Sequence, residues 1–280
     1  MLTLGLGLGR YNAPIKASKY LLDEVPNAEL AWSDELLSST YTGDCLRVRR
    51  ASDDEILDIG FANDVVDKTT LETFCDGTDG YLVTWYGQVG GINLTSTNTL
   101  RQPKIVTNGV YLGGLDFRGN EGTNAGRLTV ANQFNNIENM SVYFDVTLRS
   151  SVNSGVLYSK DMGTGHGMFV RSSDDKIIYN RRLTFNINHA SDNALSTDRE
   201  KLLVVAERVG DDYTPKLYRD NEEEVLSPLS QVGDIRDDSG TELWLGQRAN
   251  ADSSLDGLIS EAVFYSRVLD AGEINSINTI

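Results

Sequence analysis

The chain ends in Leu243-Trp-Leu-Gly-Gln-Arg248, followed by Asp256-Gly-Leu-Ile-Ser-Glu-Ala-Val-Phe-Tyr-Ser-Arg-Val-Leu-Asp-Ala-Gly-Glu-Ile274. The apolar residues and glycines of this stretch predict a strand, a turn, a second strand and a short terminal helix. Asp270 stands where the helix would begin, and Glu273 follows three residues later, which is the spacing of a capping box. Two strands closed by one capped helix are typical of the end of a β-sandwich, so this stretch indicates the fold class but not the function.

Short strand patterns recur along the rest of the chain, with almost no helical periodicity. Residues 140–148 alternate strictly, so the five even-numbered residues from Met140 to Leu148 are expected to face inward. Residues 81–86 are apolar on both faces and predict a central strand, whereas residues 46–50 place their charges on one exposed face. Short strands at this spacing predict an all-β sandwich.

The closing stretch resembles the end of concanavalin A-like, laminin-G-like jelly rolls. In that family a strand of the form G-x-I-x-E is followed by aromatic-x-R-x-L and an acid-capped turn of helix. The matching residues are Gly257, Ile259, Glu261, Tyr265, Arg267, Leu269, Glu273 and Ile274. The resemblance implies a concanavalin A-like (laminin-G-like) jelly-roll β-sandwich, here with an extended N-terminal arm.

The front half is similar to the start of the catalytic domain of fungal α-L-arabinofuranosidase B. The similar segments are residues 38–54, 67–75, 83–94, 102–106 and 115–119. Together the two resemblances imply an N-terminal docking arm and linker over residues 1–30 and a sandwich over residues 31–280. Within the sandwich, residues 31–102 would form the arabinofuranosidase B-like part and residues 103–280 the laminin-G-like part.

The front half also departs from that enzyme family. Gly87 and Val89 stand where the family's Y-D-Q-S-G-N motif has an acidic residue and a serine, and no segment corresponds to the one that carries the catalytic acids. The same front-half motif, joined to a laminin-G-like half, recurs in bacteriophage virion proteins, as does a start of the form LGLGLG. The combination resembles a bacteriophage virion structural protein.

The N-terminus alternates leucine and glycine. Leu2, Leu4, Leu6 and Leu8 would project to one side of a strand, while the glycines leave the other side bare. Because ordering glycine costs backbone entropy, such a strand is weak alone and gains stability on the edge of another sheet. We predict that these four leucines dock into a neighbouring virion subunit; the alternative is that they complete this protein's own sandwich.

The composition excludes several classes of partner. The chain carries 41 acidic and 25 basic residues, a formal net charge of −16, which repels phosphate backbones and argues against nucleic acid. No apolar run is long enough for membrane insertion. Cys45 and Cys75 have no metal-ligand spacing and are expected to remain reduced thiols. No cofactor is expected, and calcium is the one ion that acidic turns such as residues 53–54 could bind.

Few side chains suggest chemistry. Glycoside hydrolysis needs two carboxyl groups, one with a raised pKa. Glu261 is the only carboxylate inside a strongly apolar strand, and we expect it to be structural and paired with an arginine such as Arg267. His166 and His189 match no nucleophile motif and are expected in loops. Trp32, outside the predicted strands, is the best candidate for an exposed sugar-stacking side chain.

The sequence therefore predicts a non-enzymatic virion structural protein, either a capsid decoration or a tail or fibre component, with no catalytic residue. Its expected partners are other virion proteins, its expected state in the assembly is an oligomer, and its expected location is the virion. Two alternatives remain open: a carbohydrate-binding module that contacts a host-surface glycan, and a divergent glycoside hydrolase.

Overall fold

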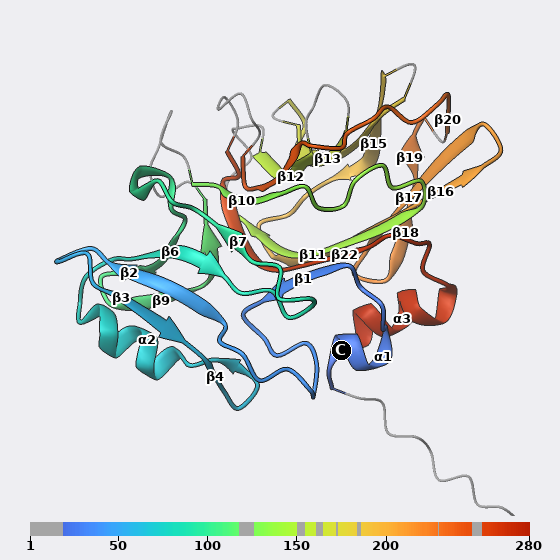
Figure 1. The fold of residues 1–280 in the computed structure, drawn as a ribbon. Helices are drawn as coiled ribbons and strands as arrows, with labels where there is room; N and C mark the ends of the chain where they lie inside the picture. Colours follow the sequence, from blue (N-terminus) through green and yellow to red (C-terminus); the bar gives the residue numbers. More distant parts are fainter. Residues whose placement is uncertain are drawn as a thin grey trace, which may run out of the picture.

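The computed structural model describes residues 19–117, 126–149, 155–160, 165–171, 173–183, 186–228, 230–247 and 254–280, which form a curved antiparallel β-sandwich (Figure 1). This confirms the fold class predicted from the sequence. The leucines predicted to dock, Leu2, Leu4, Leu6 and Leu8, lie outside the described residues, so the docking prediction stays a prediction.

The first layer is a sheet built from the two longest predicted strands. β22 (Gly257–Tyr265) lies at its centre, between β1 (Leu30–Ser33) and β11 (Met140–Leu148). The sheet continues from β11 through β16 (Arg199–Val209) to β17 (Asp212–Arg219), with β18 (Glu222–Glu224) and β20 (Gln231–Val232) at its edge.

The second layer faces the first across the core. Its strands, in order of pairing, are β7 (Leu94–Thr95), β10 (Leu128–Ala131), β21 (Glu242–Leu245), β12 (Gly155–Lys160), β13 (His166–Val170), β14 (Lys176–Arg182), β15 (Asn186–Ala194) and β19 (Leu226–Ser227). All of these pairings are antiparallel, and β12 to β15 follow one another as a meander.

The front part of the chain joins the two layers at one end. It contributes β2 (Leu46–Arg50), β3 (Ile56–Ile59), β6 (Gly80–Trp85), β8 (Lys104–Thr107) and β9 (Val110–Asp116), and a small separate hairpin of β4 (Phe61–Ala62) and β5 (Val65–Val66). β9 pairs with β22 of the first layer, and β6 pairs with β7 of the second.

Three α-helices and one 3₁₀ turn (Thr99–Arg101) lie on the surface of the described fold. The predicted C-terminal helix, α3 (Ala271–Thr279), has the complete capping box of Asp270 and Glu273. α2 (Lys68–Cys75) was not predicted; its N-terminus is capped by Asp67, which accepts a hydrogen bond from the Thr70 amide at 3.0 Å. α1 (Leu21–Glu24) was not predicted either, and it lies beside α3 under the first layer (Figure 1).

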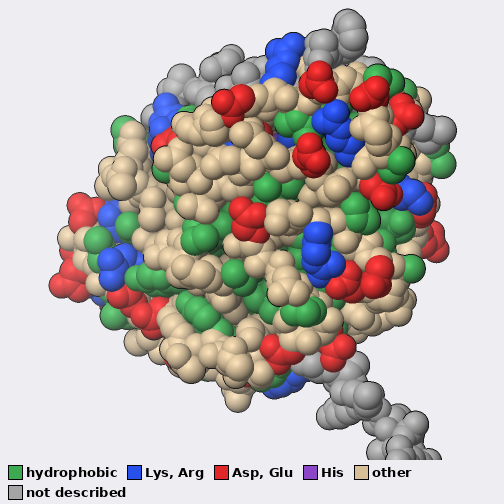
Figure 2. All heavy atoms as spheres, turned by 45° about the vertical axis from the view of Figure 1, so that its right-hand side comes forward, with side chains coloured by type: hydrophobic (Ala, Val, Ile, Leu, Met, Phe, Trp, Pro, Cys, Tyr) green, Lys and Arg blue, Asp and Glu red, His purple; other side chains and the backbone are tan. Residues whose placement is uncertain are grey.

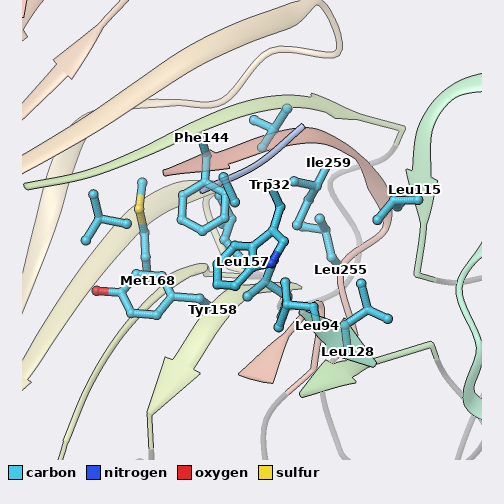
Figure 3. Close-up of a cluster of buried hydrophobic side chains, with 14 of the residues drawn as sticks. Trp32, Leu94, Leu115, Leu128, Phe144, Leu157, Tyr158, Met168, Leu255 and Ile259 are labelled. Carbon is cyan, nitrogen blue, oxygen red and sulfur yellow. The ribbon is translucent and has the colours of Figure 1, made fainter. Parts of the chain in front are cut away.

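The core is a cluster of aromatic and aliphatic side chains between the layers (Figure 3). Phe264 of β22 meets Tyr158 of β12 edge to face at 5.1 Å between ring centroids, and Phe144 of β11 stacks on the same tyrosine at 5.8 Å. Trp32 also belongs to this core: it is 0% exposed and packs on Phe264 at 6.0 Å. The prediction that Trp32 is exposed is therefore wrong, because residues 30–33 form a strand against β22.

In its central strands β11 and β22, the first layer is buried on both of its faces. The alternation predicted for β11 is confirmed, since its even-numbered residues all lie in the core. Tyr143 and Asp145, which point to the opposite face, are nevertheless only 2% exposed each. A second apolar cluster covers that outer face, in which Leu21 and Val25 of the α1 segment and Ile277 of α3 pack against Tyr143.

Candidate functional site

A row of four polar side chains crosses the outer face of the first layer. Lys201 of β16 is paired directly with Asp145 of β11, Asp145 with Glu261 of β22, and Glu261 with Ser33 of β1. Directly paired residues of antiparallel strands project from the same face, with their Cβ atoms about 4.5–5.5 Å apart. The four side chains therefore stand side by side, although their positions in the sequence are far apart.

The neighbouring row on the same face is apolar. It consists of Leu203, Tyr143, Val263 and Ala31, taken from the same four strands in the same order. The helices α1 and α3 cover this apolar row and stop short of the polar one, because the apolar side chains are the ones that gain from losing contact with water. The polar row is thus left at the edge of the covered region.

A β-bulge interrupts the pairing beside the two carboxylates. Phe144 pairs with Ala262 and Asp145 with Glu261, but Val146 pairs with Ile259, so Ser260 is an extra residue on β22. The Ser260 hydroxyl lies 3.3 Å from the backbone oxygen of Asp145 and donates to it. Bulges change the direction in which nearby side chains point and are frequent beside active sites.

A pocket of about 480 Å³ opens above the polar row. Asp145, Glu261, Tyr143 and Lys201 lie along its floor. Its walls come from residues on both sides of the row: Lys19, Leu21, Glu35, Leu36, Leu37, Arg199, Asp220, Ile277 and Ile280. The walls thus combine five apolar side chains with four charged ones, and the volume is within the range of small-molecule sites.

Glu261 is the buried carboxyl of the site. It is 7% exposed, and the Ser33 hydroxyl donates to its Oε2 atom at 3.2 Å. Burial raises the pKa of Glu261 well above its ordinary value, and the negative charges of Asp145, Glu35 and Asp34 raise it further. The hydrogen bond from Ser33 lowers it but is the smallest of these effects. Glu261 therefore holds its proton at a pH where an ordinary glutamate is ionised.

Asp145 has a different environment although it is equally buried. The Arg199 Nε atom donates to Asp145 Oδ1 at 2.6 Å, and the same guanidinium approaches Glu35 Oε1 at 3.7 Å. The hydrogen bond that Arg199 donates to Asp145 raises the pKa of Arg199, so the arginine stays charged and stabilises negative charge on Asp145. The pair thus combines a carboxyl that is protonated with one that has a cation beside it.

The partner predicted for Glu261 is wrong. Arg267 forms a bidentate ion pair with Glu273, with two N–O distances of 2.7 Å, and so belongs to the cap of α3. Glu261 faces Asp145 and Ser33 instead. Asp145 was not predicted as a site residue, although the Tyr-Phe-Asp stretch in the middle of an alternating apolar strand is the kind of signal that had singled out Glu261.

The histidines are not at this site, and the prediction that they lie in loops is also wrong. His166 lies on β13 and His189 on β15, and both are 0% exposed. His166 Nδ1 is 3.0 Å from the Tyr158 hydroxyl, and burial holds the pKa of His166 well below its ordinary value. Both residues belong to the second layer, on the far side of the core from the pocket.

The arginines of the predicted exposed strand at residues 46–50 form ion pairs with acidic residues close to them in the fold. In β2, Arg47 pairs with Asp58, Arg49 with Asp54, and Arg50 with both Asp53 and Glu55. Acidic and basic side chains are likewise interspersed over the face shown in Figure 2.

Three further findings concern metals, thiols and membranes. Cys45 and Cys75 are free, buried thiols, as expected. Within the described ranges, no three histidine, cysteine or acidic side chains gather closely enough to hold a metal ion. The helices of that part of the chain are too short and too polar to cross a bilayer.

Comparison with known proteins gives matches at the level of structure alone. No protein-family model matches the sequence, and no curated protein matches it. A GH54 α-L-arabinofuranosidase soaked with a cyclic sulfate inhibitor superposes with a TM-score of 0.59 at 14% identity, over 92% of this chain and 63% of its own. An arabinofuranosidase complexed with arabinofuranosyl-α-1,2-xylobiose gives a TM-score of 0.55 at 15% identity, with the same coverage. The chain thus spans less than two thirds of the length of these enzymes.

These matches overturn the prediction of a non-enzymatic virion structural protein. Three solved structures that match 92% of the chain are arabinofuranosidases, so the alternative of a carbohydrate-active protein fits better. Residence in a virion, docking to virion proteins and oligomerisation are not tested by these matches and stay predictions. Since 14–15% identity shows the fold alone, an activity has to be argued from the pocket. The chain has the β-sandwich fold of these arabinofuranosidases.

Proposed function

We propose that this protein is a carbohydrate-active enzyme that hydrolyses glycosidic bonds in the pocket above β11 and β22. The observation that carries the proposal is the cross-strand pair of Asp145 and Glu261, two buried carboxyl groups in unlike environments on the floor of one pocket. Two carboxyl groups whose surroundings favour opposite protonation states are the requirement for acid–base and nucleophilic catalysis at a glycosidic bond.

The spacing of the pair selects one of the two hydrolytic mechanisms. Directly paired residues have Cβ atoms about 4.5–5.5 Å apart, and both side chains project into the same pocket. Retaining glycosidases hold their carboxyl groups about 5–5.5 Å apart, whereas inverting enzymes need about 6.5–9.5 Å to admit a water molecule. Cβ atoms this close allow the two carboxyl groups to approach to the shorter of these separations, and on this ground we assign the pair a retaining mechanism.

The two residues take different roles in that mechanism. Glu261, the protonated carboxyl, gives its proton to the glycosidic oxygen as the bond to the anomeric carbon breaks. Asp145 attacks the anomeric carbon and forms a covalent ester, and Arg199 stabilises the carboxylate before the attack and after its release. Water then adds to the anomeric carbon, its proton returns to Glu261, and Asp145 leaves as the free carboxylate.

The proposal is tested by measuring glycoside hydrolysis by the purified full chain. The substrates are a panel of 4-methylumbelliferyl glycosides that includes the α-L-arabinofuranoside, and the readouts are kcat, KM and the anomeric configuration of the first product by NMR. Glu261→Gln removes the proton donor and is expected to lower kcat about 10²- to 10⁴-fold. Asp145→Asn removes the nucleophile and is expected to abolish turnover.

Matched controls separate catalysis from folding. Glu207→Gln and Asp212→Asn make the same chemical changes at exposed positions of β16 and β17, and both are expected to leave kcat unchanged. Retention of configuration is expected; inversion would contradict the assigned spacing. Activity that survives both Glu261→Gln and Asp145→Asn would place the reaction elsewhere, and sugar binding without any turnover would favour a carbohydrate-binding module.

A further inference from the structure

Among the described residues, two of the three basic side chains that line the pocket are paired with carboxylates, and the third is not. Arg199 is bonded to Asp145, and Lys19 forms an ion pair with Asp64 outside the pocket. Lys201 also lines the pocket, but within the described part of the chain no acceptor lies within hydrogen-bond or ion-pair distance of its ammonium group. Its backbone is held firmly, since its N–H donates to Asp220 Oδ1 at 2.9 Å.

Lys201 lies about one sugar ring away from the two carboxyl groups. It is the first member of the polar row, paired with Asp145, which in turn is paired with Glu261. Two steps of about 4.5–5.5 Å put its Cβ about 10 Å from that of Glu261, and only one step from that of Asp145. A sugar whose anomeric carbon meets Asp145 and Glu261 would thus reach the Lys201 ammonium with a substituent on the far side of its ring.

Resting on the function proposed above, we infer that the pocket takes an acidic sugar, a glycoside with a carboxylate on its ring, and that Lys201 binds this carboxylate. A neutral sugar offers only hydroxyl groups, whereas a carboxylate forms a charge-assisted hydrogen bond of about twice the strength. The net charge of −16 repels a densely charged polymer, so the expected glycan has isolated acidic residues.

The inference is tested with pairs of 4-methylumbelliferyl glycosides that differ only in a carboxylate or a hydroxymethyl group at C6, such as the glucuronide and the glucoside, or the galacturonide and the galactoside. For each pair the ratio of kcat/KM, acid over neutral, is measured. Lys201→Met is expected to lower this ratio about 10- to 100-fold, the equivalent of one hydrogen bond to a charged group. Lys201→Arg, which keeps the charge, is expected to restore most of it.

The matched control is Lys216→Met, which removes an exposed lysine paired with Glu223 on the next strand. It is expected to leave the ratio unchanged. Raising the salt concentration is expected to lower the ratio for the wild type, because the ion pair is partly exposed, and to have little effect on the ratio for Lys201→Met.

Calorimetric titration with the free acidic and neutral sugars separates this inference from the proposed hydrolysis. The inference is supported if uronic acids bind more tightly than their neutral counterparts and if this preference is lost in Lys201→Met. This holds even if no glycoside is hydrolysed. Hydrolysis that depends on Glu261 but shows no preference for the acidic member of any pair overturns the inference and leaves the hydrolase proposal standing. Absence of both binding and hydrolysis overturns both.

Discussion

Replacing Glu261 by glutamine is expected to change how the stability of the protein depends on pH. In the unfolded chain glutamate loses its proton near its ordinary pKa of 4.5, whereas burial and the charges of Asp145, Glu35 and Asp34 keep the proton on Glu261 to a higher pH in the folded state. Between these two pKa values the folded protein binds one more proton than the unfolded chain. Its free energy of unfolding therefore falls as the pH rises through this window.

The size of the effect follows from the number of protons involved. One proton corresponds to a slope of up to about 1.4 kcal/mol per pH unit, starting near pH 4.5 and ending once the pH passes the raised pKa. Glutamine has no proton to lose. The free energy of unfolding of Glu261→Gln should therefore rise relative to that of the wild type, by this amount for each pH unit within the window. The low exposure of Glu261, 7%, affects the width of this window, because burial disfavours the charged form and so raises the pKa at which the window ends.

The measurement is urea unfolding of both proteins, followed by tryptophan fluorescence at intervals of half a pH unit from about pH 2.5 to 8, a range that also covers the control. Glu273→Gln is the control with the opposite sign: the hydrogen bond from Arg267 lowers the pKa of Glu273, so its stabilising contribution is present above the ordinary pKa and is lost as the pH falls. A stability difference between the wild type and Glu261→Gln that does not change with pH would refute the assignment of a protonated Glu261, and with it the acid of the proposed mechanism.

Two further predictions concern the scaffold. Phe264→Ala removes the ring around which the aromatic core packs and is expected to lower the free energy of unfolding in urea by about 3–5 kcal/mol. The same change at the partly buried Phe61 is the control and is expected to cost less. Equal losses at the two positions would contradict the placement of Phe264 at the centre of the core. Gly246→Ala would place a Cβ 1.8 Å from an atom of the Phe117 ring at a backbone φ of +79°, and Gly240→Ala has the same φ in open space. Gly240→Ala is expected to lower the free energy of unfolding by about 1–2 kcal/mol, because of the backbone conformation alone. Gly246→Ala is expected to lower it by about 1–3 kcal/mol more, because of the clash with the ring. Similar unfolding midpoints for the two variants would refute the steric argument.

Local patterns predicted those features whose causes are local. The capping box of Asp270 and Glu273 forms within one turn of helix, and the alternation of β11 needs only the twofold period of a strand. α1 was missed because four residues are too few to show a helical period, and its position depends on burying Leu21 and Val25 on the sheet. The burial of Trp32 was missed for the same kind of reason, since its strand is defined by pairing with β22.

The candidate site shows where prediction from the sequence ends. Glu261 was noticed because a carboxylate within an apolar strand is unusual, but its partner was sought nearby in the chain, at Arg267. Its actual neighbours are Asp145, more than a hundred residues earlier, and Ser33 near the N-terminal end of the described fold. Local spacing carries no information about such neighbours.

The sequence by itself determined the class of fold, the inward face of the long strands and the capped closing helix, because hydrophobic period and backbone hydrogen bonding act over a few residues. Only the tertiary structure decided that Ser33, Glu261, Asp145 and Lys201 form one row beneath a pocket. The physical reason is strand register: shifting any of these strands by one residue would turn its polar side chain to the opposite face and separate the two carboxyl groups.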